Sequence, residues 1–206
     1  MILKALGGTL LALLLAGPLQ AQEISQEARG RCWGSNPNAP VVIEVFSDFS
    51  CPHCRELYLR TIRAVMADYA TAGKVCVVYY EFPLRGNRYS RQAARWAHAA
   101  IRLGPQKWLR VMDTLFRFQG RWTRDGQIEP ILASVLSEEE MNQLRQWVED
   151  PRVNVAIDRD LTEGRQRNVQ RTPTFFISAN GETERFVGSV QYGILRRYLN
   201  NLLARR

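Results

Sequence analysis

The feature that most constrains this chain is a pair of cysteines in Cys51-Pro52-His53-Cys54, directly after the apolar run 41–46. Two cysteines separated by two residues, placed where a buried strand ends and a helix begins, are typical of a dithiol redox site. A helix N-terminus offers unpaired backbone N–H groups and the positive end of the helix dipole, and both stabilise a thiolate. We therefore expect Cys51 to be the exposed, reactive thiolate and Cys54, one turn further along, to be a buried thiol.

The first 21 residues have the form of a secretory signal peptide. Lys4 supplies the positive end, and residues 5–16 form an apolar segment too short to span a bilayer. Pro18 interrupts this segment, and Leu19-Gln20-Ala21 is an acceptable cleavage site before Gln22. An uncleaved membrane anchor is the alternative. We expect an exported, soluble chain in the periplasm or another extracytoplasmic compartment.

The charge of the chain does not point to nucleic acid. The 206 residues include 28 Lys and Arg and 20 Asp and Glu, a formal net charge of +8. Most of the cations are arginines scattered through helical segments, and no nucleic-acid-reading motif accompanies them. A solvated basic surface accounts for this charge, although attraction to anionic membranes or acidic client proteins stays open.

Hydrophobic periodicity predicts an α/β fold that begins with a parallel βαβ unit and ends with a ββα unit. A capping box at Ser137 marks one helix start in the helical segment between the two units, and Asn180-Gly181 marks a hairpin turn. The expected elements are strand 41–46, a helix from Cys51, strand 75–81, helices over 89–168, strand 174–178, strand 184–187 and helix 192–204.

In this arrangement the chain resembles the DsbA-like branch of the thioredoxin superfamily. Four stretches carry the resemblance: W-G-S-N-P-N-A-P, F-S-D-F-S-C-P-H-C, E-F-P-L and R-T-P-T-F-F-I. With the helical segment they cover nearly the whole mature chain in order. The resemblance implies a thioredoxin fold interrupted by an all-helical insertion. Its expected parts are a signal peptide (1–21), an N-terminal half (22–88), the insertion (89–168) and a C-terminal half (169–206).

The resemblance also implies a site. Cys51 and Cys54 would form the catalytic disulfide, with Pro52 fixing the turn and His53 supporting the thiolate. The Thr172–Pro173 peptide bond would be cis and face the cysteines, where an extended client segment can bind by strand addition. An inert disulfide and half of a zinc site are the alternatives for the motif, but no other residues show ligand spacing. We expect no metal and no cofactor.

The remaining cysteines, Cys32 and Cys76, are interpreted as a structural disulfide. Both lie near the starts of neighbouring predicted strands, at the end of the sheet opposite the C-P-H-C motif. Such a bridge would close a loop of about 45 residues and contribute at most roughly 4 kcal/mol. Free thiols and a second redox pair stay open.

Three further groups of residues receive no catalytic role. Family members often carry a buried acid six residues before the first cysteine, where this chain has Val45; Glu44 lies one step earlier and should face the other side of the strand. His98 is expected to be an ordinary surface or packed histidine. The tryptophans of the helical segment are expected to be core residues; they are Trp96, Trp108, Trp122 and Trp147.

The leading hypothesis is an exported thiol–disulfide oxidoreductase that introduces disulfides into folding proteins. Its partners would be reduced or misoxidised exported polypeptides and a membrane redox partner that resets the dithiol, and we expect a monomer. A disulfide isomerase or reductase is the first alternative, because Thr172 is typical of isomerase-type members. Residues 22–40 are too few for the dimerisation domain of those isomerases. A redox-inactive client-binding or chaperone module is the alternative from another class.

Overall fold

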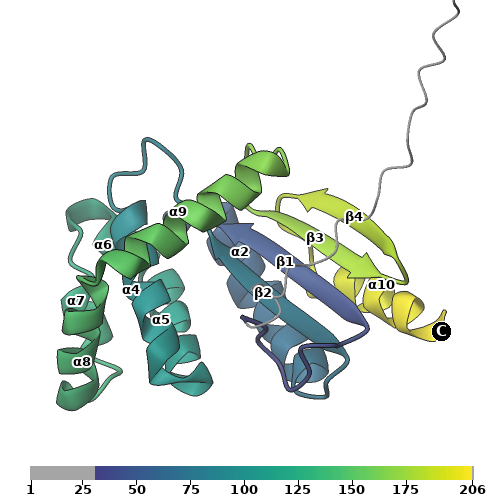
Figure 1. The fold of residues 1–206 in the computed structure, drawn as a ribbon, viewed down its shortest axis with the longest axis horizontal. Coiled ribbons are helices and arrows are strands. Elements are labelled where there is room, and N and C mark those ends of the chain that lie inside the picture. Colours follow the sequence, from purple (N-terminus) through teal and green to yellow (C-terminus); the bar gives the residue numbers. More distant parts are fainter. Residues whose placement is uncertain (1–30, 206) are drawn as a thin grey trace, which may run out of the picture.

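The computed structural model describes residues 31–205, so the expected signal peptide lies outside the described residues. Its centre is a four-stranded sheet with the order β2-β1-β3-β4 (Figure 1). β1 (Val41–Ser47) is parallel to β2 (Val75–Glu81) and antiparallel to β3 (Thr174–Ala179), which pairs with β4 (Glu182–Val187). The βαβ and ββα units expected from the sequence therefore join in one sheet, and the α/β class is confirmed.

The burial of the strands follows their places in the sheet. All seven residues of β1 and of β2 are buried, as their apolar composition predicts. β4 is one of the two edge strands, and its largely exposed, charged residues oppose pairing with other chains. Asn180 and Gly181 have φ of 53° and 79°, which the tight turn between β3 and β4 requires.

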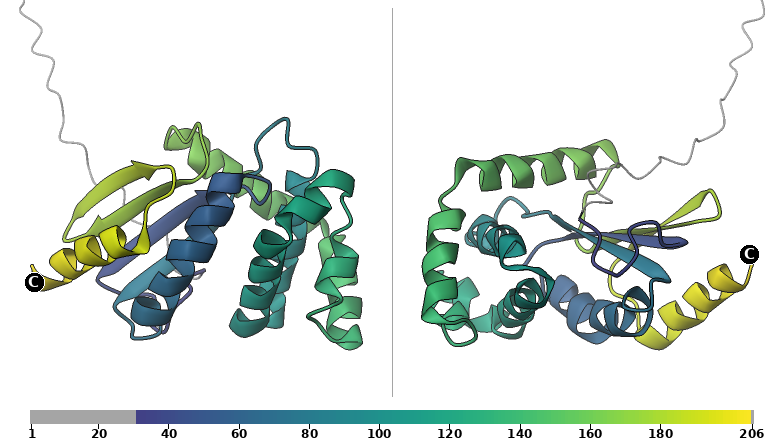
Figure 2. Two further views of the ribbon diagram at one scale, coloured as in Figure 1. Left: turned by 180° about the vertical axis from the view of Figure 1, so that it is seen from behind. Right: turned by 60° about the horizontal axis from the view of Figure 1, so that its bottom comes forward.

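Helices cover both faces of the sheet (Figure 2). One face packs against the helical segment 52–70 and against α10 (Tyr192–Ala204). The other face packs against α9 (Pro151–Gln166) through Leu161. The segment 52–70 consists of α2 (Pro52–Leu57), α3 (Arg63–Val65) and two π-helical turns, Tyr58–Ile62 and Met66–Ala70.

The helices between β2 and β3 form a group beside the β2 edge of the sheet, and α9 leads back from this group to the sheet (Figure 1). They are α4 (Ser90–Ala100), the 3-10 turn Ile101–Leu103, α5 (Pro105–Arg117), α6 (Gln119–Asp125), α7 (Glu129–Leu132) and α8 (Glu138–Val148). The capping box at Ser137 is confirmed. The domain boundaries expected within this arrangement stay a prediction. No helix within residues 31–205 is long and apolar enough to cross a bilayer.

Candidate active site

The loop before α2 is held by a buried carboxylate. Asp48 accepts hydrogen bonds from the backbone N–H groups of Ser50 and Leu84, both at 2.8–2.9 Å, and from the side chains of Asn87 and Ser90. This network joins the end of β1 to the segment after β2. It fixes Cys51 as the N-cap of α2, with Pro52 at the first helical position, where its missing N–H costs nothing.

The two cysteines of the motif are free thiols in different surroundings. Cys51 is partly exposed, whereas Cys54 is 1% exposed. The pKa of Cys51 is lowered to about 5, first by the Cys54 thiol and further by the backbone N–H groups of Cys54 and His53, while partial burial acts in the opposite direction. Burial raises the pKa of Cys54 well above its usual value, and the neighbouring Cys51 sulfur raises it further. At neutral pH the pair is therefore one thiolate and one thiol.

The Thr172–Pro173 segment lies against Cys51. Its peptide bond is cis. The Cys51 thiol donates to the Thr172 carbonyl oxygen at 3.3 Å. The Thr172 hydroxyl is buried without a hydrogen-bond partner among the described residues, and it lowers the pKa of Cys51. Thr172 thus accepts from the thiol and has a hydroxyl free to donate to the thiolate.

Ser47 and Tyr79 contact the buried cysteine, and sequence reasoning missed both. The Ser47 hydroxyl hydrogen-bonds the Cys54 sulfur and lowers its pKa, and the Asp48 N–H donates to the same sulfur at 3.4 Å. The Tyr79 hydroxyl in turn donates to Ser47 Oγ at 2.7 Å. A buried thiolate at Cys54 would therefore meet two hydrogen-bond donors.

Gln119 connects the helical segment to the redox motif. Its side-chain amide donates to the carbonyl oxygens of Phe49, at 2.6 Å, and of Cys51, at 3.0 Å. Gln119 is buried at the start of α6, and the Phe49 ring lies 4.9 Å from the Phe116 ring of α5. The corner between α5 and α6 therefore forms one wall beside Cys51.

Pro52 and His53 project from the start of α2. Both are exposed, and His53 Nδ1 lies 4.0 Å from Glu56 Oε2, at the outer limit of an ion pair. The backbone of His53 contributes to the low pKa of Cys51 through its N–H group. Among residues 31–205 no group of three or more His, Cys, Asp or Glu side chains is placed to hold a metal ion.

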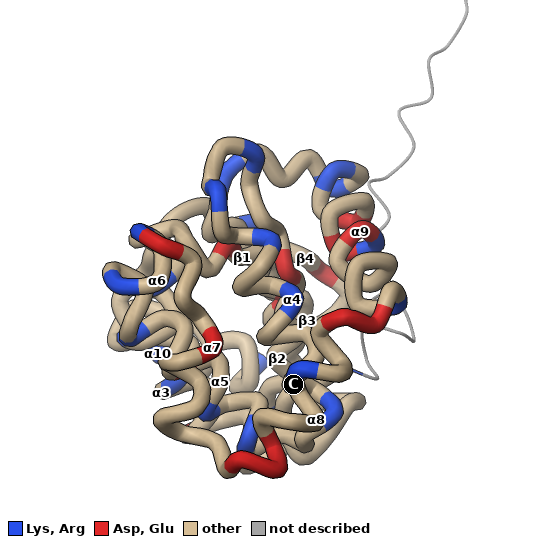
Figure 3. Tube along the Cα trace, turned by 90° about the vertical axis from the view of Figure 1, so that its left-hand side faces the viewer, with Lys and Arg blue, Asp and Glu red and all other residues tan. Residues whose placement is uncertain are grey.

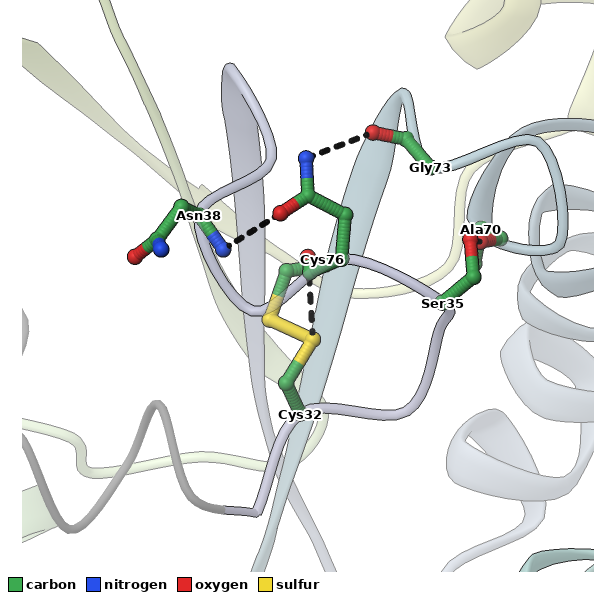
Figure 4. The surroundings of a disulfide bond; sticks show 7 residues. Cys32, Ser35, Asn38, Ala70, Gly73 and Cys76 are labelled. Carbon is green, nitrogen blue, oxygen red and sulfur yellow. Dashed lines mark hydrogen bonds between the residues drawn. A yellow bond between two sulfur atoms is a disulfide. The ribbon is translucent and has the colours of Figure 1, made fainter.

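Cys32 and Cys76 are joined by a disulfide, with their Cα atoms 5.4 Å apart (Figure 4). Cys76 pairs with Val42 in the sheet, so the bond lies at the opposite end of β1 and β2 from the redox motif. Beside it, the Asn36 side chain donates to the Gly73 carbonyl oxygen and accepts from the Asn38 N–H. The bond covalently links the N-terminal segment to β2.

Glu44 lies on the face of the sheet away from Cys54. It is 3% exposed, accepts from the Tyr80 hydroxyl at 2.9 Å and forms an ion pair with Arg167 at 3.0 Å. Val45 faces the cluster that contains Cys54, as the alternation of a strand requires. Glu44 is thus a structural residue that joins β1 to the end of α9.

His98 is a packed residue with a partner. Its Nδ1 lies 3.4 Å from Glu81 Oε2, and Arg31 and Asp160 complete the same buried cluster. No sequence spacing signals this cluster, because its four members come from four different segments. Three tryptophans of the helical segment are buried, as expected, and the fourth, Trp147, is half-buried.

Comparisons with known proteins agree with this geometry. A family model described as Thioredoxin matches residues 28–199. A probable disulfide bond formation protein D from Bacillus cereus is 22% identical over 147 residues, which are 69% of this chain and 68% of that protein.

Two solved structures illustrate the similarity of fold. Alpha-DsbA1 from Wolbachia pipientis has a TM-score of 0.71 at 18% identity and covers 85% of this chain and 91% of its own. A thioredoxin-like oxidoreductase from Silicibacter pomeroyi has a TM-score of 0.65 at 26% identity, with 81% and 88% covered. The chain therefore belongs to the thioredoxin family.

Proposed function

We propose that this chain is an exported thiol–disulfide oxidoreductase that introduces disulfides into folding proteins. The observation that carries the proposal is the contrast between Cys51, whose pKa is lowered to about 5, and the buried Cys54, whose pKa is raised. A thiolate stabilised at Cys51 favours the reduced form of the pair, so the oxidised pair readily passes its disulfide to another protein. The Bacillus cereus relative is named as a probable disulfide bond formation protein, which agrees with this direction.

The reaction begins from the Cys51–Cys54 disulfide. A client thiolate attacks the accessible Cys51 sulfur, a mixed disulfide forms, and Cys54 leaves as a thiolate that is then protonated. The client's second thiolate then attacks the client sulfur of the mixed disulfide, and Cys51 leaves as a thiolate. The client loses two electrons and gains a disulfide, while the enzyme gains two electrons and becomes the dithiol.

Thr172 and Pro173 receive the client in this proposal. Their segment precedes β3 and lies against Cys51, where an extended client chain can pair with the backbone of Thr172. The clients are reduced or misoxidised exported polypeptides. A membrane redox partner withdraws the two electrons from the dithiol and completes the cycle.

The equilibrium of the purified dithiol with glutathione tests the direction. A potential near about −120 mV supports an oxidase, whereas one near about −270 mV assigns the protein as a reductant. Thr172, the residue that favours the isomerase alternative, makes a scrambled-disulfide refolding assay a useful second measurement. A Cys51→Ala variant with unchanged activity on clients would favour the chaperone alternative.

A further inference from the structure

We propose that the corner between α5 and α6 forms a docking surface for acidic client segments beside Cys51. This inference rests on the proposed function, since it names the class of polypeptide that the same site receives. The surface is a hollow of about 500 Å³, here called the basic hollow, lined by Arg55, Arg117, Phe118, Gln119, Gly120, Arg121 and Arg124.

The charge of the basic hollow has one sign. Four of its seven lining residues are arginines and none is acidic. Arg117, Arg121 and Arg124 are exposed, and no described carboxylate forms an ion pair with them. Figure 3 shows blue segments at α6, with a red segment beside them where the helix ends in Asp125. Uncompensated guanidinium groups around a hollow attract carboxylates and can bind them through two parallel hydrogen bonds.

The acids nearest in sequence are occupied elsewhere. Asp113 of α5 forms an ion pair with Arg63 and accepts from the Tyr58 hydroxyl. Asp125, at the end of α6, accepts from the Gln127 N–H. Glu56 of α2 accepts from the Ser189 hydroxyl. Arg117, Arg121 and Arg124 therefore form no ion pair with these three acids, whereas the Arg55 side chain is held by the Phe116 carbonyl oxygen.

Two lining residues of the basic hollow contact the backbone of Cys51. Gln119 lines the hollow, and its amide donates to the carbonyl oxygen of Cys51. Arg55 lies one turn after Cys51 in α2, where its backbone N–H donates to the Cys51 carbonyl oxygen and its side chain to that of Phe116. A client whose cysteine reaches Cys51 would thus bring its flanking residues over the arginines.

An acidic polypeptide fits this surface better than a lipid headgroup does. The hollow is concave, its Gln119 side chain contacts the Cys51 backbone, and Phe118 adds an exposed aromatic ring to its arginines. A peptide can fill both the hollow and the site, whereas a membrane bound here would cover Cys51. Long-range attraction of this kind raises association rates and weakens as salt is added.

The test compares three cysteine peptides that differ only in flanking Glu, Gln or Lys residues. For each peptide, the second-order rate constant for exchange with the enzyme is divided by the rate constant of the same peptide with a small neutral disulfide. The readout is the ratio of these normalised rate constants between two peptides. This division removes the effect of the flanks on the peptide's own thiol. Wild type should favour Glu over Gln by about tenfold at low salt and lose most of the preference at high salt.

Two charge-matched variants decide where the preference arises. Arg117→Gln/Arg121→Gln/Arg124→Gln should bring the ratio to within about twofold of one. The control Arg165→Gln/Arg196→Gln/Arg197→Gln removes the same charge from exposed positions on α9 and α10, and it should retain the preference. If the Glu-over-Gln preference fell equally in both variants, it would arise from the net charge of the protein, and the proposed docking surface would be wrong.

Two further outcomes separate this inference from the proposed function. If wild type fails to exchange disulfides with dithiothreitol, the proposed function itself is wrong. If dithiothreitol reacts but Glu and Gln peptides react equally, only the docking surface is wrong. Arginine-dependent sedimentation with phosphatidylglycerol vesicles, in the absence of a peptide preference, would assign the hollow to a membrane.

Discussion

Cys51 and Cys54 lie in one helical turn but differ in the groups that surround their sulfur atoms. Cys51 accepts from a neighbouring thiol and two backbone N–H groups at the helix start, and these favour its thiolate. Cys54 is surrounded by apolar residues of the sheet face, and burial favours its thiol. The difference between the two pKa values therefore comes from hydrogen bonding at Cys51 and from burial at Cys54.

This difference predicts that only one of the two cysteine thiols titrates at low pH in the reduced protein. Thiolate absorbance should rise with a midpoint near pH 5 and then stay level until above about pH 9, since the pKa of Cys54 is raised. Because the Cys51 pKa is lower in the folded than in the unfolded chain, its contribution to the stability of the reduced form is complete above about pH 9. That contribution falls as the pH falls through about 5.

The control is a Cys51→Ser variant, in which the absorbance step near pH 5 should vanish. A midpoint above about pH 7 in the unaltered protein would contradict the prediction, because the thiolate would then be little stabilised by the fold.

A second prediction concerns the hydroxyl groups behind Cys54. Ser47→Ala removes a donor to the leaving Cys54 thiolate, and Tyr79→Phe removes the hydroxyl that orients Ser47. A hydrogen bond to a charged group contributes about 1.5–3 kcal/mol, so Ser47→Ala should slow attack on the oxidised site by roughly 10- to 100-fold. Stopped-flow reaction of the oxidised protein with glutathione measures this rate.

Tyr79→Phe should slow the same reaction to a smaller extent. Ser178→Ala, which removes a hydroxyl that pairs with Thr183 on the β3–β4 hairpin, serves as the control and should react normally. Unchanged rates in Ser47→Ala would show that Cys54 leaves without help from this hydroxyl.

At the scale of single residues, the sequence predicted the cysteines of the motif but not the side chains that contact them. Cys51 and Cys54 could be assigned because their spacing and their place after a strand are local signals. Ser47, Tyr79 and Gln119 reach the same sulfurs or carbonyl oxygens from three separate segments, and their contacts depend on sheet register and helix packing. Nothing in their spacing along the chain encodes that proximity.

Among the helices and strands, those whose ends are marked by distinctive residues in the sequence were well predicted. The strand Val75–Glu81 and the helix Tyr192–Ala204 have the expected limits, and Ser137 caps its helix. The short helices α6 and α7 were not separated from their neighbours, because contacts such as the Trp122 indole to the Leu115 carbonyl oxygen define them. The two π-helical turns after α2 have no local signal either.

The packing of α9 against the sheet gives a prediction at this scale. Gly164 has no room for a Cβ atom, which would lie 2.8 Å from Phe82 Cδ2 and 3.1 Å from Phe46 Cδ1. Gly164→Ala should therefore lower the free energy of unfolding by about 1–3 kcal/mol, although alanine is the better helix former. Urea denaturation measures the change.

Gly193→Ala provides the matched control. Gly193 also lies in a helix, α10, and nothing is within 4 Å of its Cβ position. This substitution should raise the free energy of unfolding by up to about 1 kcal/mol. If both variants were stabilised, α9 would not pack closely on Phe82.

Across the whole molecule, one buried cluster connects the sheet with the helices beside it. Arg31 precedes β1, Glu81 ends β2, His98 lies in α4 and Asp160 in α9, and ion pairs join them. Burial alone would lower the pKa of His98, but Glu81 outweighs burial, and the pKa is raised. The charged form of His98 therefore stabilises the native arrangement.

The cluster predicts a pH-dependent cost for His98→Gln. Because the pKa of His98 is raised by folding, its contribution is complete below its ordinary pKa of about 6.5 and is lost as the pH rises through the folded value. The difference in unfolding free energy between wild type and variant should be largest near pH 6 and fade towards pH 9. A difference that does not change with pH would indicate a packing role alone.

The Cys32–Cys76 disulfide gives the last prediction. The bond spans 44 residues and crosslinks the N-terminal segment to β2, far from the redox motif. In a Cys51→Ser/Cys54→Ser background, reducing agent should lower the melting temperature, since opening this loop costs at most roughly 4 kcal/mol in the chain-entropy model. Cys32→Ser/Cys76→Ser in the same background should melt at the lower temperature with or without reductant.

Activity measurements distinguish whether Cys32 and Cys76 form a structural disulfide or a second redox pair. With Cys51 and Cys54 intact, Cys32→Ser/Cys76→Ser should still exchange disulfides with glutathione at the wild-type rate below its melting temperature. The Cys76 side chain is fully buried and Cys32 is partly exposed, so without local unfolding of β2 a client sulfur could attack this disulfide only at Cys32. Loss of exchange in a variant that remains folded would contradict the structural role, because electrons would then have to pass through this second pair.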